Sequence, residues 1–480
     1  MMRELIKKIK SLPQGLKASV AFFFASVVTS GISYIVTPIY TRLLSADEYG
    51  KTSVFLTWVQ VFGILAMFCL HYGVFNNGMM DYKDKRDDYS FSMLILSNII
   101  TVAFTLVLVG LYPLIKDIID MDMPLLLLMC AVFFFQPAHN FWLMRQRYEL
   151  KYKSTVVWVV ICALASPLAA VTCILLFPGQ KLYARLFGAE LALIVIYILF
   201  YIYLGYRNKF KINTKYWKAA LLFNLPLIPH YLSTYLLGNS NKIMISALVD
   251  DKSAAYYSVA YTVAAVAMIV WNAANASLVP YTYENCAKKN YKAISNVTIP
   301  ILVLFAVICV FVIMLAPEVV AIMATADYRE AIYVIPPIVG GVFFQVQYFI
   351  YANVVYFCKK PKYVMFASIT SVLVNFVLSY LLITNFGYLA AGYSTLICYF
   401  LQATIDYFAM KKLIKAEVYN MRYIGVLSLV VILIAIFSNL LYSWMIIRYA
   451  IIALLLALCF VFRKQIIKIF TDMRSNKQDA

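Results

Sequence analysis

The sequence is built from long apolar segments, each about as long as a bilayer's hydrocarbon core is thick. A membrane-spanning helix needs about 20 mostly apolar residues, and 64% of the 480 residues are apolar while 13% are charged. This composition excludes a soluble enzyme, a disordered chain, a coiled coil and a protein with a single membrane anchor. A β-barrel would show short alternating segments instead of continuous apolar runs. We therefore predict an all-α polytopic membrane protein.

The apolar segments predict fourteen membrane-spanning helices. They cover residues 17–41, 51–75, 90–113, 123–144, 154–177, 182–204, 217–248, 254–280, 294–316, 331–357, 363–384, 388–410, 421–443 and 446–468. The first run is too long for a removable signal peptide. The connections are short and leave no room for a soluble catalytic domain, so the function should lie within the helices and their ends.

Basic residues gather at alternate ends of the predicted helices. When the connections are assigned to alternating sides from the N-terminus, 32 of the 41 Lys and Arg residues fall on one side. Basic residues accumulate in cytoplasmic loops, so this side should be the cytoplasm, and both termini should lie there. The net charge of +19 then belongs to a membrane surface, and we expect no nucleic-acid partner.

Local patterns recur about 204 to 209 residues apart. The clearest pairs are Phe134-Phe135-Gln136 with Phe343-Phe344-Gln345, and Lys151-x-Lys153 with Lys360-x-Lys362. One six-helix unit separates them, and an even number of helices keeps its orientation, so the pattern predicts a parallel pseudo-two-fold repeat. We expect a six-helix lobe at 1–215, a second at 216–418, and helices 13–14 with a cytoplasmic tail at 419–480. The alternative is coincidence in an aromatic-rich sequence.

Motifs for nucleotide or metal chemistry are incomplete. Gly50-Lys51-Thr52 resembles the end of a phosphate-binding loop, but the first Gly of that motif would fall at Ser45. The three His residues have no metal-ligand spacing, and most of the nine Cys lie in apolar runs, where Cys acts as a small hydrophobe. We expect no bound ATP, no metal and no cofactor.

Three cations within or at the ends of apolar segments are candidate substrate-binding residues. Arg42 ends the first helix, Arg185 lies in the sixth, and Lys242 follows Asn239-Ser240-Asn241 in the seventh. Charges at membrane depth are costly and mark function or pairing, so these cations could hold an anion. The alternative for Arg42 and Lys242 is that their side chains extend to the membrane surface.

Two carboxylates within the helices are candidate ion-coupling residues. Glu190 lies in the sixth helix and Asp406 late in the twelfth. Glu190 could instead pair with Arg185, although a spacing of five is poor on one helix. Asp406 could instead lie at the cytoplasmic end of its helix, close to Lys411 and Lys412.

Prolines interrupt the helices that open the two predicted lobes. Pro38 lies in the first helix, and Pro226 and Pro229 lie in the seventh. Proline removes a backbone donor and kinks a helix, so these residues are candidate hinges of a moving, cavity-lining element. A static kink that packs on its neighbours is the alternative.

Three stretches resemble a known family. They are TPIYTRLLSxxEYG at residues 37–50, LPLIPHYLS at 225–233, and the segment 375–392 that joins the eleventh and twelfth helices. The first is similar to the first-helix signature of Wzx-type polysaccharide (O-antigen) flippases, in the multidrug/oligosaccharidyl-lipid/polysaccharide exporter superfamily. The resemblance covers roughly 15–415. It departs at Asn241-Lys242, where such proteins often carry Asp-Arg, so an ion-pair switch is not expected there.

The resemblance implies two lobes around a central cavity and alternating access without ATP. It implies transport of a polyprenyl-diphosphate-linked oligosaccharide across the bacterial cytoplasmic (inner) membrane. This would be the repeat unit of an O-antigen, the polysaccharide of lipopolysaccharide, or of a capsule or exopolysaccharide. Partners would be this lipid-linked oligosaccharide, membrane lipid, and a polysaccharide polymerase with a chain-length regulator. Arg42, Lys242 and Arg185 would bind the diphosphate. Asn224, Asn239 and Asn241 would add polar contacts.

Two other functions fit a polytopic membrane protein. A cation-coupled multidrug exporter of the same superfamily would want carboxylates in its cavity, and only Glu190 and Asp406 lie well inside the predicted helices. A membrane polysaccharide polymerase or ligase would need a large external loop with catalytic charges, which the short connections do not provide. We therefore expect a transporter and not an enzyme.

Overall fold

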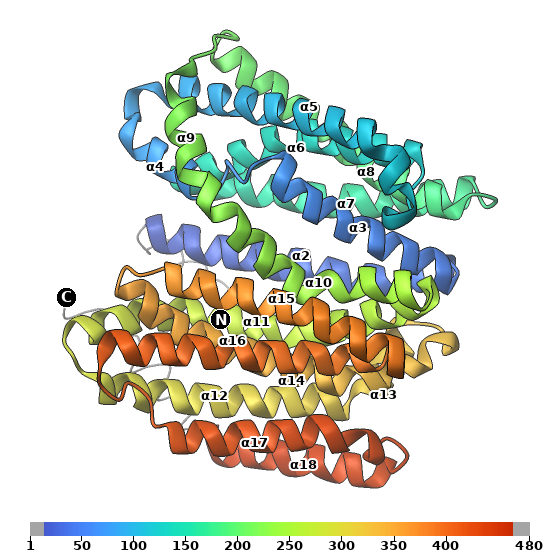
Figure 1. Cartoon of the computed structure of the whole chain (residues 1–480), viewed down its shortest axis with the longest axis vertical. Coiled ribbons are helices and arrows are strands. Elements are labelled where there is room, and N and C mark those ends of the chain that lie inside the picture. The colour runs from blue at the N-terminus through green and yellow to red at the C-terminus, as the bar shows by residue number, and fades with distance from the viewer. Residues whose placement is uncertain (1–13, 464–480) are drawn as a thin grey trace, which may run out of the picture. The chain divides into compact units, whose positions relative to one another are not determined.

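A computed structural model describes residues 14–463 of the chain (Figure 1). Helices are the regular elements of this described part, so the predicted all-α fold is confirmed. Eleven of the described helices are long and apolar enough to cross a membrane, and a shorter apolar helix covers Met445–Val461. The chain is therefore a multi-pass membrane protein. Residues 1–13 and 464–480, and with them the predicted cytoplasmic tail, lie outside the described residues.

The chain divides into two compact units, Met1–Tyr235 and Leu236–Ala480. Unit 1 holds α2 (Gln14–Leu43), α3 (Ala46–Ala66), α4 (Gly73–Asp81), α5 (Arg86–Ile119), α6 (Met123–Tyr148), α7 (Tyr152–Leu176), α8 (Lys181–Arg207) and α9 (Trp217–Asn224). Unit 2 holds α11 (Asp251–Ala287), α12 (Tyr291–Met314), α13 (Ala316–Met323), α14 (Ile335–Phe357), α15 (Lys362–Phe386), α16 (Ala390–Ile414), α17 (Met421–Phe437) and α18 (Met445–Val461). The division falls inside α10 (Ile228–Leu248).

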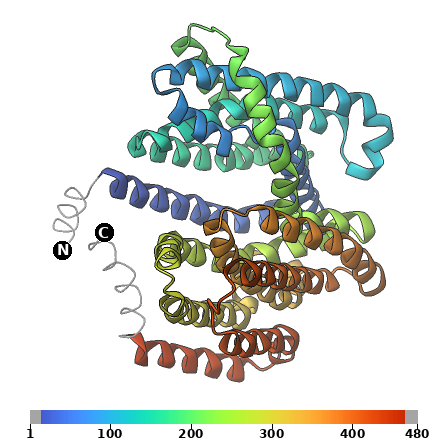
Figure 2. The ribbon, with the colours of Figure 1, turned by 60° about the vertical axis from the view of Figure 1, so that its left-hand side comes forward.

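The observed division lies later in the chain than the predicted lobe boundary at 215. The last two helices, α17 and α18, belong to unit 2 and lie beside α12 in both views (Figures 1 and 2). The members of each repeated pattern lie on helices at corresponding places in the chain order. Phe134 lies in α6 and Phe343 in α14, while Lys151 immediately precedes α7 and Lys360 lies just before α15. The six-helix lobes themselves stay a prediction.

The predicted helix 51–75 is wrong in its second half. Ser45 caps α3 in a reciprocal arrangement. The backbone N–H of Glu48 donates to the Ser45 hydroxyl, and the backbone N–H of Ser45 donates to the Glu48 carboxylate. The helix ends at Ala66, because Phe68 (φ 54°) and Cys69 (φ 50°) adopt left-handed backbone angles that no α-helix continues. The apolar run passes through this break, so hydropathy could not reveal it.

The predicted helix 217–248 lies within one candidate membrane span, Thr214–Leu248, but its hydrogen bonding changes inside that span. Residues Leu225–Leu227 form a 3-10 turn between α9 and α10, with Pro226 inside it and Pro229 in the first turn of α10. Proline offers no N–H to the helical ladder, which accounts for the break. Pro38, in contrast, lies inside α2, which continues to Leu43. The hinge role of these prolines stays a prediction.

The core of unit 2 is centred on α14, whose side chains are buried along nearly its whole length. It packs against α16 at small residues. A Cβ atom at Gly392 of α16 would lie 2.7 Å from Cγ of Pro337 and 3.2 Å from the Val334 carbonyl oxygen. Only glycine permits this approach, because both neighbours are rigid.

Candidate functional site

Arg185 is a buried cation near the start of α8. Its side chain is 8% exposed, and its guanidinium carbon lies 4.4 Å from the centre of the Tyr40 ring. Among the described residues, its Nε and Nη1 atoms have no hydrogen-bond partner. A guanidinium group carries five N–H donors, and the face of an aromatic ring satisfies the charge but not the donors. Arg185 can therefore bind an anion.

The end of α2 supplies the surroundings of Arg185. Tyr40 is itself buried, and Lys181 Nζ donates to the Leu43 carbonyl oxygen at 2.9 Å. Arg42 is exposed, and its Nη1 donates to the Pro38 carbonyl oxygen at 2.8 Å. The last carbonyl groups of a helix lack partners within it and attract cations. Arg42 thus lies at the end of α2, which also presents Tyr40 to Arg185.

Glu190 follows Arg185 on the same helix and is 8% exposed. Within residues 14–463, no ion pair joins the two side chains. The spacing of five residues places them more than a turn apart. Glu190 therefore does not neutralise Arg185 by direct contact, and both side chains keep the capacity to bind another group.

Lys242 is the candidate cation of unit 2. It is partly buried in α10, and its Nζ lies 3.1 Å from Oδ1 of Asn239 and 5.1 Å from the centre of the Tyr261 ring. Both groups are neutral. No carboxylate of the described residues lies within ion-pair distance of Lys242, so its charge is not balanced by a direct partner there.

Asn241 is 1% exposed and joins four helices of unit 2. Its Nδ2 lies within hydrogen-bond distance of the Tyr257 hydroxyl, the Ala391 carbonyl, Ser394 and Thr395, at 2.9 to 3.3 Å. Its Oδ1 accepts from the Ser379 hydroxyl at 2.8 Å. These contacts use the whole amide, so Asn241 holds α10 against α11, α15 and α16.

Asn224 is likewise enclosed. It is fully buried at the end of α9, and its Nδ2 donates to the Phe68 carbonyl oxygen at 3.0 Å. This bond ties α9 to the left-handed turn after α3. Of the three candidate asparagines, the structure brings only Asn239 into contact with a candidate cation.

Asp406 is fully buried in α16. Neither carboxyl oxygen has a hydrogen-bond partner among the described residues. Burying a carboxyl group without a partner is costly, and such groups in membrane proteins mark proton or ion sites. The alternative, an Asp at an exposed helix end, does not fit this burial.

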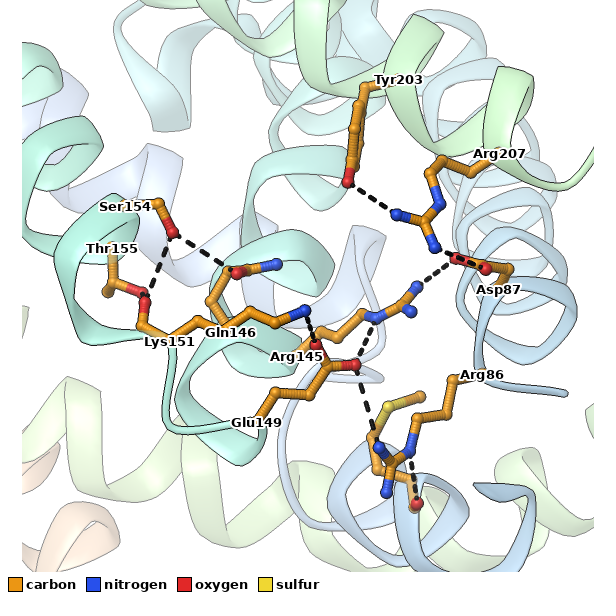
Figure 3. A network of polar contacts seen from close by, with 11 residues as sticks. Arg86, Asp87, Arg145, Gln146, Glu149, Lys151, Ser154, Thr155, Tyr203 and Arg207 are labelled. Carbon is orange, nitrogen blue, oxygen red and sulfur yellow. Dashed lines mark hydrogen bonds and ion pairs between the residues drawn. The ribbon is translucent and has the colours of Figure 1, made fainter. Parts of the chain in front are cut away.

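A network of charged side chains that sequence reasoning missed lies at one end of unit 1 (Figure 3). Asp87 at the start of α5 contacts Arg145 near the end of α6, and its Oδ2 accepts from Arg207 at the end of α8 at 3.0 Å. Glu149 accepts from Arg145 at 2.9 Å and from Lys151 at 2.5 Å. The network joins three helix ends. The basic members of the network contribute to the predicted orientation, and Lys151 also to the predicted repeat, but the sequence did not predict these contacts.

Glu149 lies between two helices, in the turn that follows α6. Burial opposes its ionisation, but the hydrogen bonds from Lys151 and Arg145 outweigh this cost and lower its pKa below the ordinary value of 4.5. Glu149 is therefore the charged partner around which the basic side chains of this turn gather. Within residues 14–463, this network included, no three His, Cys, Asp or Glu side chains lie close enough to hold a metal ion.

Residues 16–286 match the family model described as polysaccharide biosynthesis protein. Over 101 residues the chain is 30% identical to protein 1 of the Lsg locus of Haemophilus influenzae, a match that spans 20% of this chain and 25% of that relative.

The fold is similar to two kinds of solved transporter. One is the lipid II flippase MurJ in an inward closed conformation, with a TM-score of 0.64 and 14% identity, covering 94% of this chain and all of that chain. The other is an inward-facing multidrug resistance MATE family transporter of the MOP superfamily, with a TM-score of 0.63 and 13% identity, covering 80% and 94%. At these identities the likeness concerns the fold.

Proposed function

The chain belongs to the polysaccharide biosynthesis protein family, and we propose that it is a flippase for a polyprenyl-diphosphate-linked oligosaccharide. The substrate would be a repeat unit of O-antigen, capsule or exopolysaccharide, moved by alternating access. The membrane would be the bacterial cytoplasmic membrane, with both termini on the cytoplasmic side. A polymerase and a chain-length regulator would act on the product. The shared fold with a lipid II flippase supports this proposal.

The observation that carries the proposal is the buried guanidinium of Arg185. A diphosphate has to cross an apolar layer about 30 Å thick, and a charge at that depth is costly without a partner. Arginine binds phosphate oxygens in pairs through its planar fork of donors. Two donor atoms of Arg185, Nε and Nη1, are unengaged by described residues, and Tyr40 packs against the guanidinium.

Lys242 is the second cation in this proposal, because its direct contacts are neutral. Asn239, which accepts from it, would orient the ammonium group. Arg42 would meet the diphosphate at the exposed end of α2. Asn224 and Asn241 support the helices and are not assigned to the substrate.

A cation-coupled exporter is the second candidate function. The observation that favours it is the buried, unpartnered carboxyl group of Asp406, which could bind a proton or a metal cation. Glu190 is the corresponding candidate in unit 1. Both residues are also compatible with a flippase that uses an ion gradient, so substrate and coupling have to be tested separately.

Transport in liposomes tests the function. The full chain is reconstituted with a fluorescent polyprenyl-diphosphate-linked oligosaccharide, and a membrane-impermeant quencher measures how fast the label reaches the outer leaflet. We expect the protein to accelerate crossing, and Arg185→Gln to remove most of the acceleration. Lys209→Gln, an exposed charge change in unit 1, is the matched control. Efflux of a cationic dye without lipid crossing would contradict the flippase and support the exporter.

A further inference from the structure

A basic groove lies at the end of unit 2 where α14 leads into α15 and where α16 ends. Its volume is about 720 Å³. Four lysines line it: Lys359 and Lys360 from the turn, Lys362 from the start of α15, and Lys412 from the last turn of α16. All four are exposed. None of the described residues that line the groove is acidic.

The other wall of the groove is apolar. Phe366 and Phe408 line it and are 63% and 60% exposed. Phe366 lies one turn after Lys362 in α15, and Phe408 lies one turn before Lys412 in α16, so both rings are farther from these helix ends than the lysines. α15 is apolar enough to cross a membrane, so Phe366 lies one turn inside a candidate membrane span that begins at Lys362. The groove therefore has a cationic end and an apolar end.

The predicted internal repeat pairs the lysines of the groove with a turn of unit 1 that carries a carboxylate. Lys151-x-Lys153 in unit 1 corresponds to Lys360-x-Lys362 in unit 2. In unit 1, Glu149 binds Lys151 at 2.5 Å and Arg145 at 2.9 Å, which places a negative charge among the basic residues of the turn. The residue at the place of Glu149 in unit 2 is Cys358, which is neutral. The lysines of the second turn thus lack the carboxylate that their counterparts have.

We propose that the groove binds an anionic phospholipid, with its phosphate among the lysines and an acyl chain along Phe366 and Phe408. Basic pockets at helix ends on the cytoplasmic side bind acidic headgroups. The two-ended chemistry favours a lipid over a free phosphate, because only a lipid would contact both the lysines and the two phenylalanine rings of the groove. The bound lipid supplies the negative charge that Glu149 supplies in unit 1. Neither Arg185 nor Lys242 lines the groove, and the proposal does not depend on the transported substrate.

Native mass spectrometry of the full chain in detergent tests the proposal. The protein is titrated with phosphatidylglycerol and with phosphatidylcholine, and the apparent Kd of each is compared. We expect phosphatidylglycerol to bind more tightly. Removing Lys360, Lys362 and Lys412 together by substitution with Gln should weaken its binding about fivefold per lysine, or more than about a hundredfold in total. Lys209, Lys211 and Lys215 in unit 1, changed to Gln together, form the charge-matched control.

A second variant tests the comparison between the units. Cys358→Glu recreates the arrangement of unit 1 without removing a lysine, and we expect it to weaken phosphatidylglycerol binding while phosphatidylcholine binding stays unchanged. Equal binding of both lipids to the wild type would overturn the proposal, as would a triple variant that binds like the control. Displacement of phosphatidylglycerol by an equal concentration of inorganic diphosphate would show that the groove binds the phosphate alone, and would overturn the assignment of a lipid.

Discussion

The guanidinium group of Arg185 lies against the face of the Tyr40 ring at 4.4 Å, which connects α8 to α2 within unit 1. The ring stabilises the buried charge and leaves donors of the fork for a ligand. Tyr40 belongs to the stretch that resembles the signature of polysaccharide flippases. One residue of that signature, Tyr40, thus has a physical role in this structure, because its ring contacts the buried cation.

Arg185→Gln is expected to reduce transport about tenfold to a hundredfold, because hydrogen bonds to charged groups contribute about 1.5–3 kcal/mol. Arg185→Lys should retain part of the activity, since lysine keeps the charge but not the paired donors. Tyr40→Leu should fall between these two variants. The measurement is surface glycan in a deletion strain complemented at matched membrane levels. Full surface glycan from Arg185→Gln would remove this residue from the binding site.

Lys242→Gln is expected to reduce transport more than Lys242→Arg, because only the first change removes the charge. Arg42→Gln should have the smallest effect of the cation variants, since Arg42 is exposed and donates to the Pro38 carbonyl. The same complementation assay ranks the three. If Lys242→Gln and Arg42→Gln were both silent, their side chains would serve only at the membrane surface.

Asp406→Asn is expected to fold as well as the wild type, because it removes a buried ionisable group that has no hydrogen-bond partner among the described residues. Its effect should appear in coupling. Transport driven by an imposed pH or sodium gradient should fall to the rate seen without a gradient. Liposomes loaded with each gradient measure this, with thermal unfolding as the check on folding. Unchanged gradient dependence would exclude Asp406 as the coupling residue.

Glu149→Gln is expected to lower thermal stability at neutral pH and to matter less in acid. The pKa of Glu149 in the folded protein lies below its ordinary value of 4.5, so its ion pairs stabilise the fold above that value. The contribution is lost as the pH falls through the lowered pKa. Because the pairs are partly solvated, we expect about 1 kcal/mol or less at about pH 7. Unfolding temperatures of both proteins against pH should converge below pH 4.5; parallel curves would contradict the assignment.

Gly392→Ala is expected to destabilise unit 2 by about 1–3 kcal/mol, the usual cost of overpacking a core. The added methyl group would lie 2.7 Å from Pro337 Cγ, and neither the proline ring nor the Val334 carbonyl can move freely. Gly425→Ala in α17 is the control, since nothing lies within 4 Å of its added Cβ. Equal unfolding temperatures for the two variants would show that α14 and α16 can separate.

The helices were predictable from the sequence because a bilayer demands long apolar runs and the chain has little else. The break after Ala66 was not, because the left-handed angles of Phe68 and Cys69 leave the apolar run intact. The turn after Ala66 is contacted by a residue far away in the sequence, since Asn224 donates to the Phe68 carbonyl oxygen. Local hydropathy carries no information about such a contact.

The candidate site was predictable in part. Arg185 and Glu190 are recognisable because charges are rare in apolar helices. Helical spacing puts Asn239 beside Lys242, because residues three apart on a helix are neighbours. The role of Asn241 was not predictable, since only packing shows that its amide turns into the core. The network at Asp87 was missed because each of its members resembles an ordinary solvated end of a helix.

Asn241 also fixes the rotation of the second half of α10. Rotating this helix by one residue, about 100°, would carry the amide away from Tyr257, Ala391 and Ser379 at once. Such a rotation would leave a buried amide without these hydrogen bonds, which is energetically costly. The movements that keep these contacts are a bend near Leu225–Leu227 and a displacement of α10 together with α11, α15 and α16. A single side chain thereby selects which motions the helix can contribute to a transport cycle.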